Sequence, residues 1–165
     1  MELPVSFLDN PSESVSLRID KQIGEGKFTV FRVYCASRKA NYALKIFPTH
    51  REGTSFFRRE QRFCRFSHPN IIQRFPISCQ NSEFHAHLTE FAKFGDFFDV
   101  VNDKLIKNNE ALIRTYFHQL ISGLEYLHSH GVAHIDLKLA NLMVGLNFEL
   151  KIIDFDQAQL TSDNH

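Results

Sequence analysis

The sequence predicts an α+β fold in which a β-rich first half is followed by a mainly helical second half. Apolar residues alternate with polar ones in several short runs between residues 15 and 91, as they do in half-buried strands. From Glu110 onward the apolar spacing changes to that of one long amphipathic helix. At 165 residues the chain is long enough for about one domain with a buried core.

The first half is predicted to begin with a flexible lead-in at 1–14, because prolines and serines are frequent there. Strands are then expected at 15–19, 31–35, 42–47, 71–78 and 84–91. Between the third and fourth of these strands, phenylalanines lie among arginines at 55–66, which predicts a short and partly exposed helix.

The second half begins near 92–96 and contains the long helix that starts at Glu110. Asn109 can accept a hydrogen bond from the first turn of this helix, and Gly131 can end it in a left-handed conformation. Short strands are expected at 142–144 and 150–154.

Composition excludes several classes of partner and compartment. Nineteen basic and nineteen acidic residues cancel, so neither nucleic acid nor a membrane surface is expected as the main partner. Cys35, Cys64 and Cys79 show no disulfide or metal-ligand spacing, which indicates the cytoplasm, with the nucleus as the alternative. The sequence contains neither a signal-peptide pattern nor an apolar run of membrane-spanning length.

The most specific pattern is the polar loop after the long helix. It reads His134-Ile135-Asp136-Leu137-Lys138-Leu139-Ala140-Asn141, and Asp154-Phe155 follows thirteen positions after Asn141. This set supplies one candidate base, one cation and two oxygen ligands for a metal ion. Phosphoryl transfer needs such a set, because a hydroxyl must be oriented and the charge of the phosphate must be neutralised.

Five further motifs occur in a fixed order with this loop. They are Ile23-Gly24-Glu25-Gly26-Lys27-Phe28, Ala43-Leu44-Lys45, Arg59-Glu60, His68-Pro69-Asn70-Ile71-Ile72 and Thr89-Glu90-Phe91. With these motifs and the loop in this order, the chain resembles the eukaryotic protein kinase family over residues 15–158. The five motifs resemble, in turn, the glycine-rich loop, the strand of the ATP-anchoring lysine, the helix of its glutamate partner, the turn into the next strand, and the adenine-contacting hinge.

The resemblance implies a protein kinase-like fold of two lobes. The ATP-binding N-lobe would span 15–92 as a small antiparallel sheet plus one helix, and a truncated, mainly helical C-lobe would span 93–165. ATP and Mg²⁺ are the implied cofactors, and ATP would sit between the lobes. The implied partner is a protein substrate with a serine or threonine hydroxyl, since Lys138 favours this class over tyrosine kinases.

The resemblance also assigns roles to single residues. Asp136 would orient the substrate hydroxyl, Lys138 would lie beside the γ-phosphate, and Asn141 and Asp154 would hold Mg²⁺. The residues implied to bind ATP are Gly24, Gly26, Val30, Ala43, Lys45, Glu60, Glu90, Phe91 and Met143. Glu60 is the expected partner of Lys45, because a buried lysine needs a counter-charge.

Several positions depart from the family pattern. Thr29 stands in place of a third glycine, Ile135 in place of an arginine that binds a phosphorylated activation loop, and Asp156 in place of the glycine after Asp154-Phe155. The chain ends at His165, before the family's substrate-binding segment and later helices. The apolar face of the long helix is therefore expected to lack its usual cover and to attract a partner.

Three functions from different classes remain open at the level of sequence. The first is a protein serine/threonine kinase, and the second is a kinase-like binding module that transfers no phosphate. The third is a small-molecule kinase with a similar loop, against which Lys138 and the turn at His68 speak. His85 and His87 share a strand face, but surface or core histidines are favoured there over a metal pair.

Overall fold

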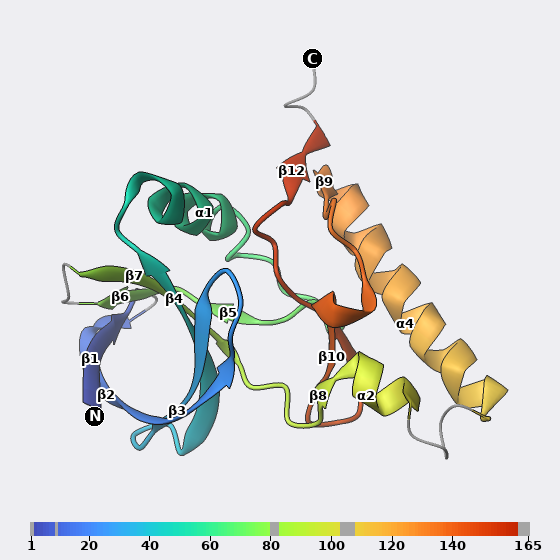
Figure 1. The fold of residues 1–165 in the computed structure, drawn as a ribbon, viewed down its shortest axis with the longest axis horizontal. Coiled ribbons are helices and arrows are strands. Elements are labelled where there is room, and N and C mark those ends of the chain that lie inside the picture. The colour runs from blue at the N-terminus through green and yellow to red at the C-terminus, as the bar shows by residue number, and fades with distance from the viewer. Residues whose placement is uncertain (1, 9, 80–82, 103–107, 162–165) are drawn as a thin grey trace. The chain divides into compact units, whose positions relative to one another are not determined.

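The computed structural model divides the chain into two compact units (Figure 1). The first unit contains Met1–Arg65 and Gln73–Phe91, and the second contains Phe66–Ile72 and Ala92–His165. The structure describes residues 2–8, 10–79, 83–102 and 108–161.

The first unit is a seven-stranded antiparallel sheet with one helix. Its strands are β1 (Glu2–Phe7), β2 (Asn10–Gly24), β3 (Thr29–Cys35), β4 (Ala40–Pro48), β5 (Arg74–Phe75), β6 (Ile77–Cys79) and β7 (Phe84–Glu90). They follow the order β5-β7-β4-β3-β2-β1-β6 across the sheet. Because Pro76 alone separates β5 from β6, the two ends of this order meet, and the sheet curls round on itself (Figure 1).

The prediction of a flexible lead-in at 1–14 is wrong. β1 pairs with β2 from Glu2 to Phe7 on one side and with β6 on the other. Leu3, Val5 and Phe7 alternate inward with exposures of 8%, 1% and 0%, so this segment contributes apolar side chains to the core. The prolines and serines suggested a loop, but burial of the alternate side chains stabilises a strand here.

The curled sheet encloses the apolar core of the first unit. Its buried members come from six of the seven strands and include Leu3, Val5, Phe7, Val15, Leu17, Val33, Cys35, Tyr42, Leu44, Ile77, Ala86 and Leu88. Each strand contributes every second residue to the interior, as the two-residue period of a strand requires. The strands predicted at 15–19, 31–35 and 42–47 lie within β2, β3 and β4, which the structure extends.

Two other predicted elements of this unit are shifted. The strand expected at 71–78 is divided by Pro76 into β5, which pairs with β7, and β6, which pairs with β1. The helix expected at 55–66 is α1 (Arg51–Gln61), which begins four residues earlier. His50 caps it by accepting a hydrogen bond from Gly53 N at 3.3 Å. Only glycine fits at Gly53, because a Cβ there would lie 2.2 Å from the Pro48 carbonyl oxygen.

In the part of the second unit that the structure describes, two α-helices occur together with short strands. They are β8 (Gly95–Asp96), α2 (Phe97–Asn102), α4 (Glu110–Ser129), β9 (Val132–Ala133), a 3-10 turn (Leu139–Asn141), β10 (Leu142–Val144), β11 (Leu150–Ile152) and β12 (Gln159–Leu160). β11, β10 and β8 form one antiparallel sheet, and β12 pairs with β9. The strand predicted at 142–144 is β10, and β11 ends two residues before the predicted 150–154.

The long helix α4 forms as predicted. Asn109 Oδ1 accepts a hydrogen bond from Leu112 N at 3.0 Å, which satisfies one of the free donors of the first turn. Gly131 has a φ of 68° directly after the helix, in the left-handed conformation expected of it. Local signals at both ends therefore define this element.

The segment Phe66–Ile72 belongs to the second unit although it precedes β5. Ile72 N donates to Ile152 O at 3.0 Å, and Ile152 N donates to Asn70 O at 2.9 Å. Asn70 Nδ2 also donates to Leu150 O at 3.0 Å. These bonds hold the segment along β11.

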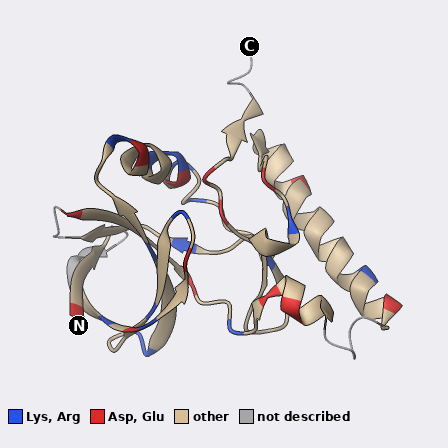
Figure 2. Cartoon of the chain, in the orientation of Figure 1, with Lys and Arg blue, Asp and Glu red and all other residues tan. Residues whose placement is uncertain are grey.

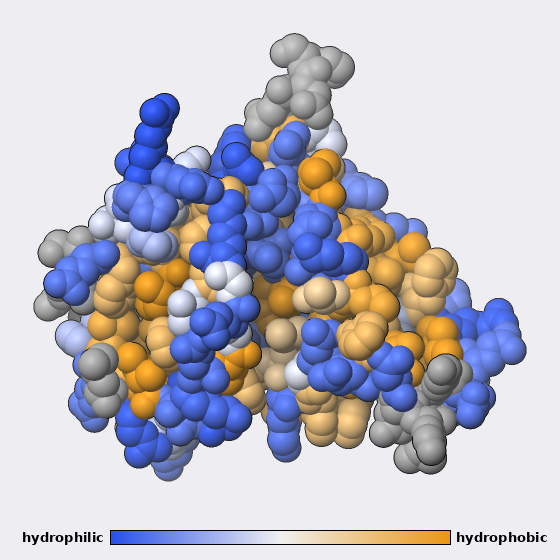
Figure 3. Space-filling model, in the orientation of Figure 1, coloured by the Kyte–Doolittle hydropathy of each residue, from blue (hydrophilic) through white to orange (hydrophobic). Residues whose placement is uncertain are grey.

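Part of α4 presents apolar side chains to solvent, as the sequence led us to expect. Ile113, Phe117 and Ile121 recur every four residues along the helix and are 39%, 59% and 38% exposed. Apolar surface is visible over α4 in Figure 3. The partner expected at this face stays a prediction. Among the described residues, the helices are too short or too polar to span a bilayer.

Candidate functional site

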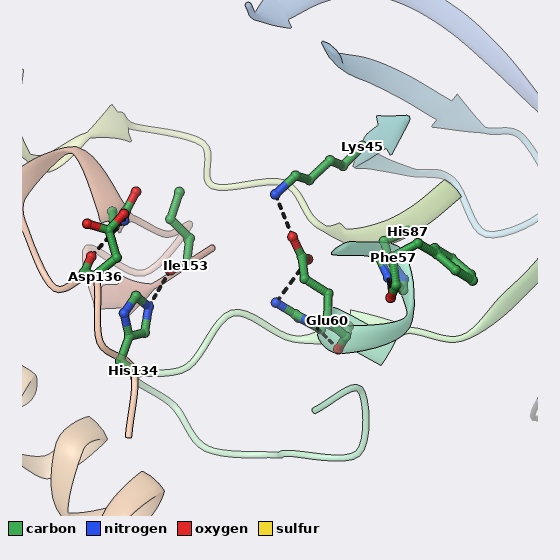
Figure 4. Close-up of polar contacts among 9 residues, drawn as sticks. Lys45, Phe57, Glu60, His87, His134, Asp136 and Ile153 are labelled. Atoms are coloured by element: carbon green, nitrogen blue, oxygen red, sulfur yellow. Dashed lines mark hydrogen bonds and ion pairs between the residues drawn. The ribbon is translucent and has the colours of Figure 1, made fainter. Parts of the chain in front are cut away.

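Three charged side chains of the first unit form a buried cluster (Figure 4). Lys45 Nζ lies 2.5 Å from Glu60 Oε1, and Arg74 Nη2 lies 3.3 Å from Glu60 Oε2. The side chains of Lys45, Glu60 and Arg74 are 17%, 4% and 5% exposed. The ion pair that the sequence predicted between Lys45 and Glu60 is present, and Arg74 is a third member that the sequence analysis missed.

The sheet and α1 place these side chains. Lys45 lies in β4, opposite Val30 of β3 on one side and His87 of β7 on the other. Glu60 lies in the last turn of α1, and Arg74 lies in β5 opposite Thr89. The cluster therefore joins the helix to two strands of the sheet.

His87 is a buried neutral neighbour of this cluster. Burial, together with the positive charges of Arg74 and Lys45, lowers its pKa to about 4, although Glu60 and a hydrogen bond to the backbone act in the opposite direction. Its ring stacks on Phe57 at 4.5 Å between centroids, and its Nε2 lies 3.1 Å from Phe57 O.

His85 also stacks on Phe57, at 4.7 Å. These ring contacts account for both histidines of β7. The described residues contain no group of three or more His, Cys, Asp or Glu that could hold a metal ion.

The glycine-rich segment after β2 lies against α1. The Phe28 ring is 4.6 Å from Phe47 and 5.5 Å from Phe56, and Lys45 Nζ lies 5.2 Å from the Phe28 centroid. Lys27 Nζ lies 3.4 Å above the Phe56 ring. The aromatic side chain of this segment is thus close to the ammonium group of Lys45.

The remaining residues predicted to bind ATP in this unit lie on neighbouring strands. Gly24 pairs with Val30 across β2 and β3, and Ala43 lies in β4 opposite Thr89, while Gly26 is in the exposed turn. A Cβ built on Gly24 would lie 3.3 Å from Val30 Cβ, so the two strands approach closely there.

Glu90 and Phe91 lie at the end of the first unit. Glu90 Oε1 accepts a hydrogen bond from Gln73 N at 2.8 Å, and Glu90 N donates to Gln73 O at 2.9 Å. The guanidinium of Arg32 lies 5.9 Å from the Phe91 ring. Glu90 therefore holds the chain at Gln73, and its contact with adenine stays a prediction.

In the second unit, the loop after β9 brings Asp136, Lys138 and Asn141 together. Lys138 Nζ donates to Asp136 Oδ2 at 2.7 Å, and Asn141 Nδ2 donates to the same oxygen at 3.0 Å and to Asp136 O at 2.8 Å. The hydrogen bond from Lys138 lowers the pKa of Asp136, with a further contribution from Asn141. The bond to Asp136 in turn raises the pKa of Lys138, and the charges of Asp154 and Asp156 add to this effect.

The backbone around Asp136 is strained. Ile135 has a φ of 68° and is 62% exposed, and Asp136 N donates to His134 O at 2.9 Å across it. This three-residue turn is a costly conformation for a β-branched residue. On the inner side, His134 Nε2 lies 2.8 Å from Ile153 O (Figure 4). The His134 ring also packs on Phe155. His134 is 3% exposed, so it packs behind the loop.

Asp154 lies close to this loop through a backbone bond. Ile153 N donates to Asn141 O at 3.0 Å, and Asp154 follows with a φ of 59°. Met143, the predicted floor of the adenine site, lies in β10 between Asp96 and Lys151 of the neighbouring strands. The structure thus brings together the loop residues, Asp154 and Met143 within one unit.

The oxygen atoms of Asn141 and Asp154 fit the chemistry of Mg²⁺. Both hydrogen bonds of the Asn141 amide involve its nitrogen, so the donor that remains for a cation is the hard amide oxygen. A carboxylate at Asp154 supplies a second hard oxygen, and Mg²⁺ prefers such ligands. These two residues would hold the ion, which would screen the negative charge of a phosphate.

Asp156 is 7% exposed and adopts no left-handed backbone conformation. A side chain at this position therefore causes none of the backbone strain that a residue standing in place of glycine could introduce. Its negative charge acts on Lys138. The sequence left its effect on the site open, and its direct binding of a metal ion stays a prediction.

Comparison with known proteins decides the family. The family model of the protein kinase domain matches residues 17–165. This chain belongs to the protein kinase domain family. Its mixed helices and strands and its antiparallel sheet agree with that assignment.

The similar proteins are protein kinases. CBL-interacting protein kinase 26 of Oryza sativa subsp. japonica is 37% identical over 151 residues, which cover 87% of this chain and 30% of that protein. Serine/threonine-protein kinase SIK1 of Mus musculus is 32% identical over 143 residues, or 83% of this chain and 18% of that protein. CBL-interacting serine/threonine-protein kinase 3 of Arabidopsis thaliana is 33% identical over 150 residues, which cover 87% of this chain and 33% of that protein. The chain thus spans about a third or less of these relatives.

Proposed function

We propose that this kinase domain transfers the γ-phosphate of Mg-ATP to a serine or threonine hydroxyl of a protein. The observation that supports this most directly is the convergence of Lys138 and Asn141 on the Asp136 carboxylate, next to Asp154. The family implies ATP and a divalent cation in general. The names of its relatives as serine/threonine kinases support the class of substrate.

Asp136 is suited to orient the attacking hydroxyl. Because its pKa is lowered, the carboxylate is ionised at neutral pH and accepts a hydrogen bond from the substrate. As the hydroxyl oxygen bonds to the γ-phosphorus, its proton passes to Asp136. The bond from phosphorus to the bridging oxygen breaks at the same time, and its electron pair leaves with ADP.

Each unit contributes one lysine to the proposed chemistry. Lys138, whose pKa is raised, stays protonated and would neutralise charge on the transferred phosphoryl group. Lys45, held by Glu60, would contact the phosphates of the nucleotide. Mg²⁺ held by Asn141 and Asp154 would neutralise the remaining phosphate charge.

The test is incorporation of labelled phosphate into a generic protein substrate in the presence of Mg²⁺. Asp136→Asn keeps the size of the side chain but cannot take the proton, so we expect incorporation to fall by about 10²–10⁴-fold. The exposed ion pair between Glu110 and Arg114 on α4 provides the matched control. Glu110→Gln makes the same kind of change outside the proposed site and should retain wild-type incorporation. Equal incorporation by the wild type and Asp136→Asn contradicts the proposal.

A kinase-like binding module is the second candidate, and the position of Phe28 favours it. Its ring lies 5.2 Å from Lys45 Nζ, so an aromatic side chain is next to the ammonium group that would contact the phosphates. Calorimetric titration with Mg-ATP separates the candidates. Binding without phosphate transfer supports the module, whereas binding with transfer supports the kinase.

A further inference from the structure

Arg74 is a buried cation, and two nitrogens of its guanidinium group contact the same residue, Glu60. Nη1 donates to Glu60 O at 2.7 Å, while Nη2 lies 3.3 Å from Glu60 Oε2. A guanidinium cannot lose its proton in a protein, so an arginine that is 5% exposed requires partners of this kind. The two contacts reach both the backbone and the side chain of Glu60.

This arrangement divides the Glu60 carboxylate between two cations. Oε2 faces Arg74, and Oε1 faces Lys45 at 2.5 Å. The contact with Glu60 O also fixes the last turn of α1 against β5. Because one planar group holds the carbonyl and the carboxylate together, it restricts both the position and the rotation of the glutamate.

A second contact between α1 and the sheet near this point carries no charge. His87 of β7 stacks on Phe57 and lies 3.1 Å from its carbonyl oxygen, one helical turn before Glu60. Its lowered pKa keeps it neutral at physiological pH. The orientation of the Glu60 carboxylate is therefore controlled by Arg74 and Lys45 rather than by His87.

We propose that Arg74 is a positioning residue that holds Glu60 Oε1 toward Lys45 before any nucleotide binds. For its consequence on ATP binding, this role rests on the proposed function. The effect on Lys45 itself is independent of nucleotide. Loss of Arg74 leaves Glu60 free to change its orientation, so Lys45 spends more time unpaired.

The experiment measures how fast a short pulse of acetic anhydride acylates Lys45 in the full chain, with mass spectrometry of the peptide as readout. Acylation requires a free amine, which the ion pair with Glu60 withholds. Arg74→Met should accelerate labelling of Lys45 roughly threefold or more, a coupling within the range for contacting residues. Arg74→Lys, which keeps the charge but loses the two-point contact, should give a smaller increase.

Two comparisons separate positioning from a general loss of structure. In a Glu60→Gln background, Arg74→Met should have little further effect on labelling, because the residue through which it acts has already changed. Arg114→Met removes an arginine from the exposed pair with Glu110 and should leave labelling of Lys45 unchanged. Circular dichroism establishes whether each variant is folded. If Arg74→Met does not fold, the same comparison is made with Arg74→Lys as a single variant and with Arg74→Lys combined with Glu60→Gln.

The proposal is overturned if labelling of Lys45 is the same in the wild type and the folded Arg74 variant, or if the increase persists undiminished with Glu60→Gln. A second arm adds Mg-ATP to the wild type, where we expect protection of Lys45 and a lower affinity after Arg74→Met. Absence of protection contradicts nucleotide binding through Lys45, while the labelling without nucleotide still decides the role of Arg74.

Discussion

Each unit of this chain contains a lysine–carboxylate pair of similar length in a different environment. Lys45 and Glu60 are 2.5 Å apart with side chains 17% and 4% exposed, whereas Lys138 and Asp136 are 2.7 Å apart with side chains 55% and 35% exposed. Figure 2 marks the basic residues of the chain in blue and the acidic residues in red. Breaking a buried pair leaves a charge without solvent, while water replaces the partner in an exposed pair. Burial therefore makes the first pair a structural element, and exposure leaves the second pair accessible to a substrate.

The largest expected effect is on the buried pair. Glu60→Ala leaves Lys45 and Arg74 without their shared carboxylate and should lower the free energy of unfolding by about 3–5 kcal/mol, as measured by urea denaturation. Asp136→Asn should leave the unfolding curve close to that of the wild type, although it should strongly lower the proposed phosphate transfer. Similar losses of stability in both variants would contradict the contrast between the units.

A pair of phenylalanines extends the comparison to apolar residues. Phe7 of β1 is 0% exposed, and Phe117 of α4 is 59% exposed. Phe7→Ala should cost about 3–5 kcal/mol in thermal or urea unfolding because it leaves a cavity inside the curled sheet. Phe117→Ala should change stability by about 0.5 kcal/mol or less. A small effect of Phe7→Ala would show that β1 contributes little to the first unit.

The pH dependence of stability should also distinguish the units. The pKa of His87 is about 4 in the folded chain and has its ordinary value near 6.5 in the unfolded chain. Between these pH values the unfolded chain binds more protons than the folded chain does. The contribution of His87 to the free energy of unfolding is therefore complete above pH 6.5 and is lost as the pH falls toward 4, by roughly 3 kcal/mol. Melting of the first unit should show this slope.

His87→Phe removes the titrating group and should flatten the slope, whereas His85→Phe, on the same strand face, should retain it. The two variants are compared by melting temperature at about pH 7 and about pH 4.5. An unchanged slope after His87→Phe would assign the acid sensitivity to other groups.

The smallest expected effect concerns the strained turn at Ile135. Ile135→Gly relieves a left-handed conformation and should stabilise the chain by about 1 kcal/mol in urea unfolding. The looser turn should at the same time slow phosphate transfer, because it no longer fixes Asp136. Lys39→Gly, at an exposed turn with a φ of 49°, should bring a similar gain without affecting transfer. Faster phosphate transfer in Ile135→Gly would contradict the idea that the left-handed backbone at residue 135 holds Asp136 in position.

Local signals in the sequence predicted some elements well. The helix α4 has an apolar face, a capping asparagine directly before its first residue and a glycine two residues after its last, so all three signals are local in the sequence. The sequence contains no strong signal for the start of α1, because His50 is an uncommon cap and glycine is unfavourable inside a helix. The close approach of Gly53 to Pro48 is visible only in three dimensions.

Non-local contacts explain what the sequence did not predict. β1 is stabilised by pairing with β6, more than sixty residues further along the chain, and no pattern within 1–14 reports that partner. Arg74 stands singly in a short strand, so its contact with Glu60 carried no local signal. The signal that could have found it is a single arginine within a predicted apolar strand, where burial would require a partner of opposite charge.

The closing of the sheet by β1 has a consequence for the extent of the folding unit. The family match begins at residue 17, but β1 covers the backbone groups of β2 on one side and of β6 on the other. A shortened protein beginning at residue 17 would expose two rows of free amide and carbonyl groups. Such rows recruit strands from other molecules, so this shortened form should aggregate under conditions that keep the full chain monodisperse.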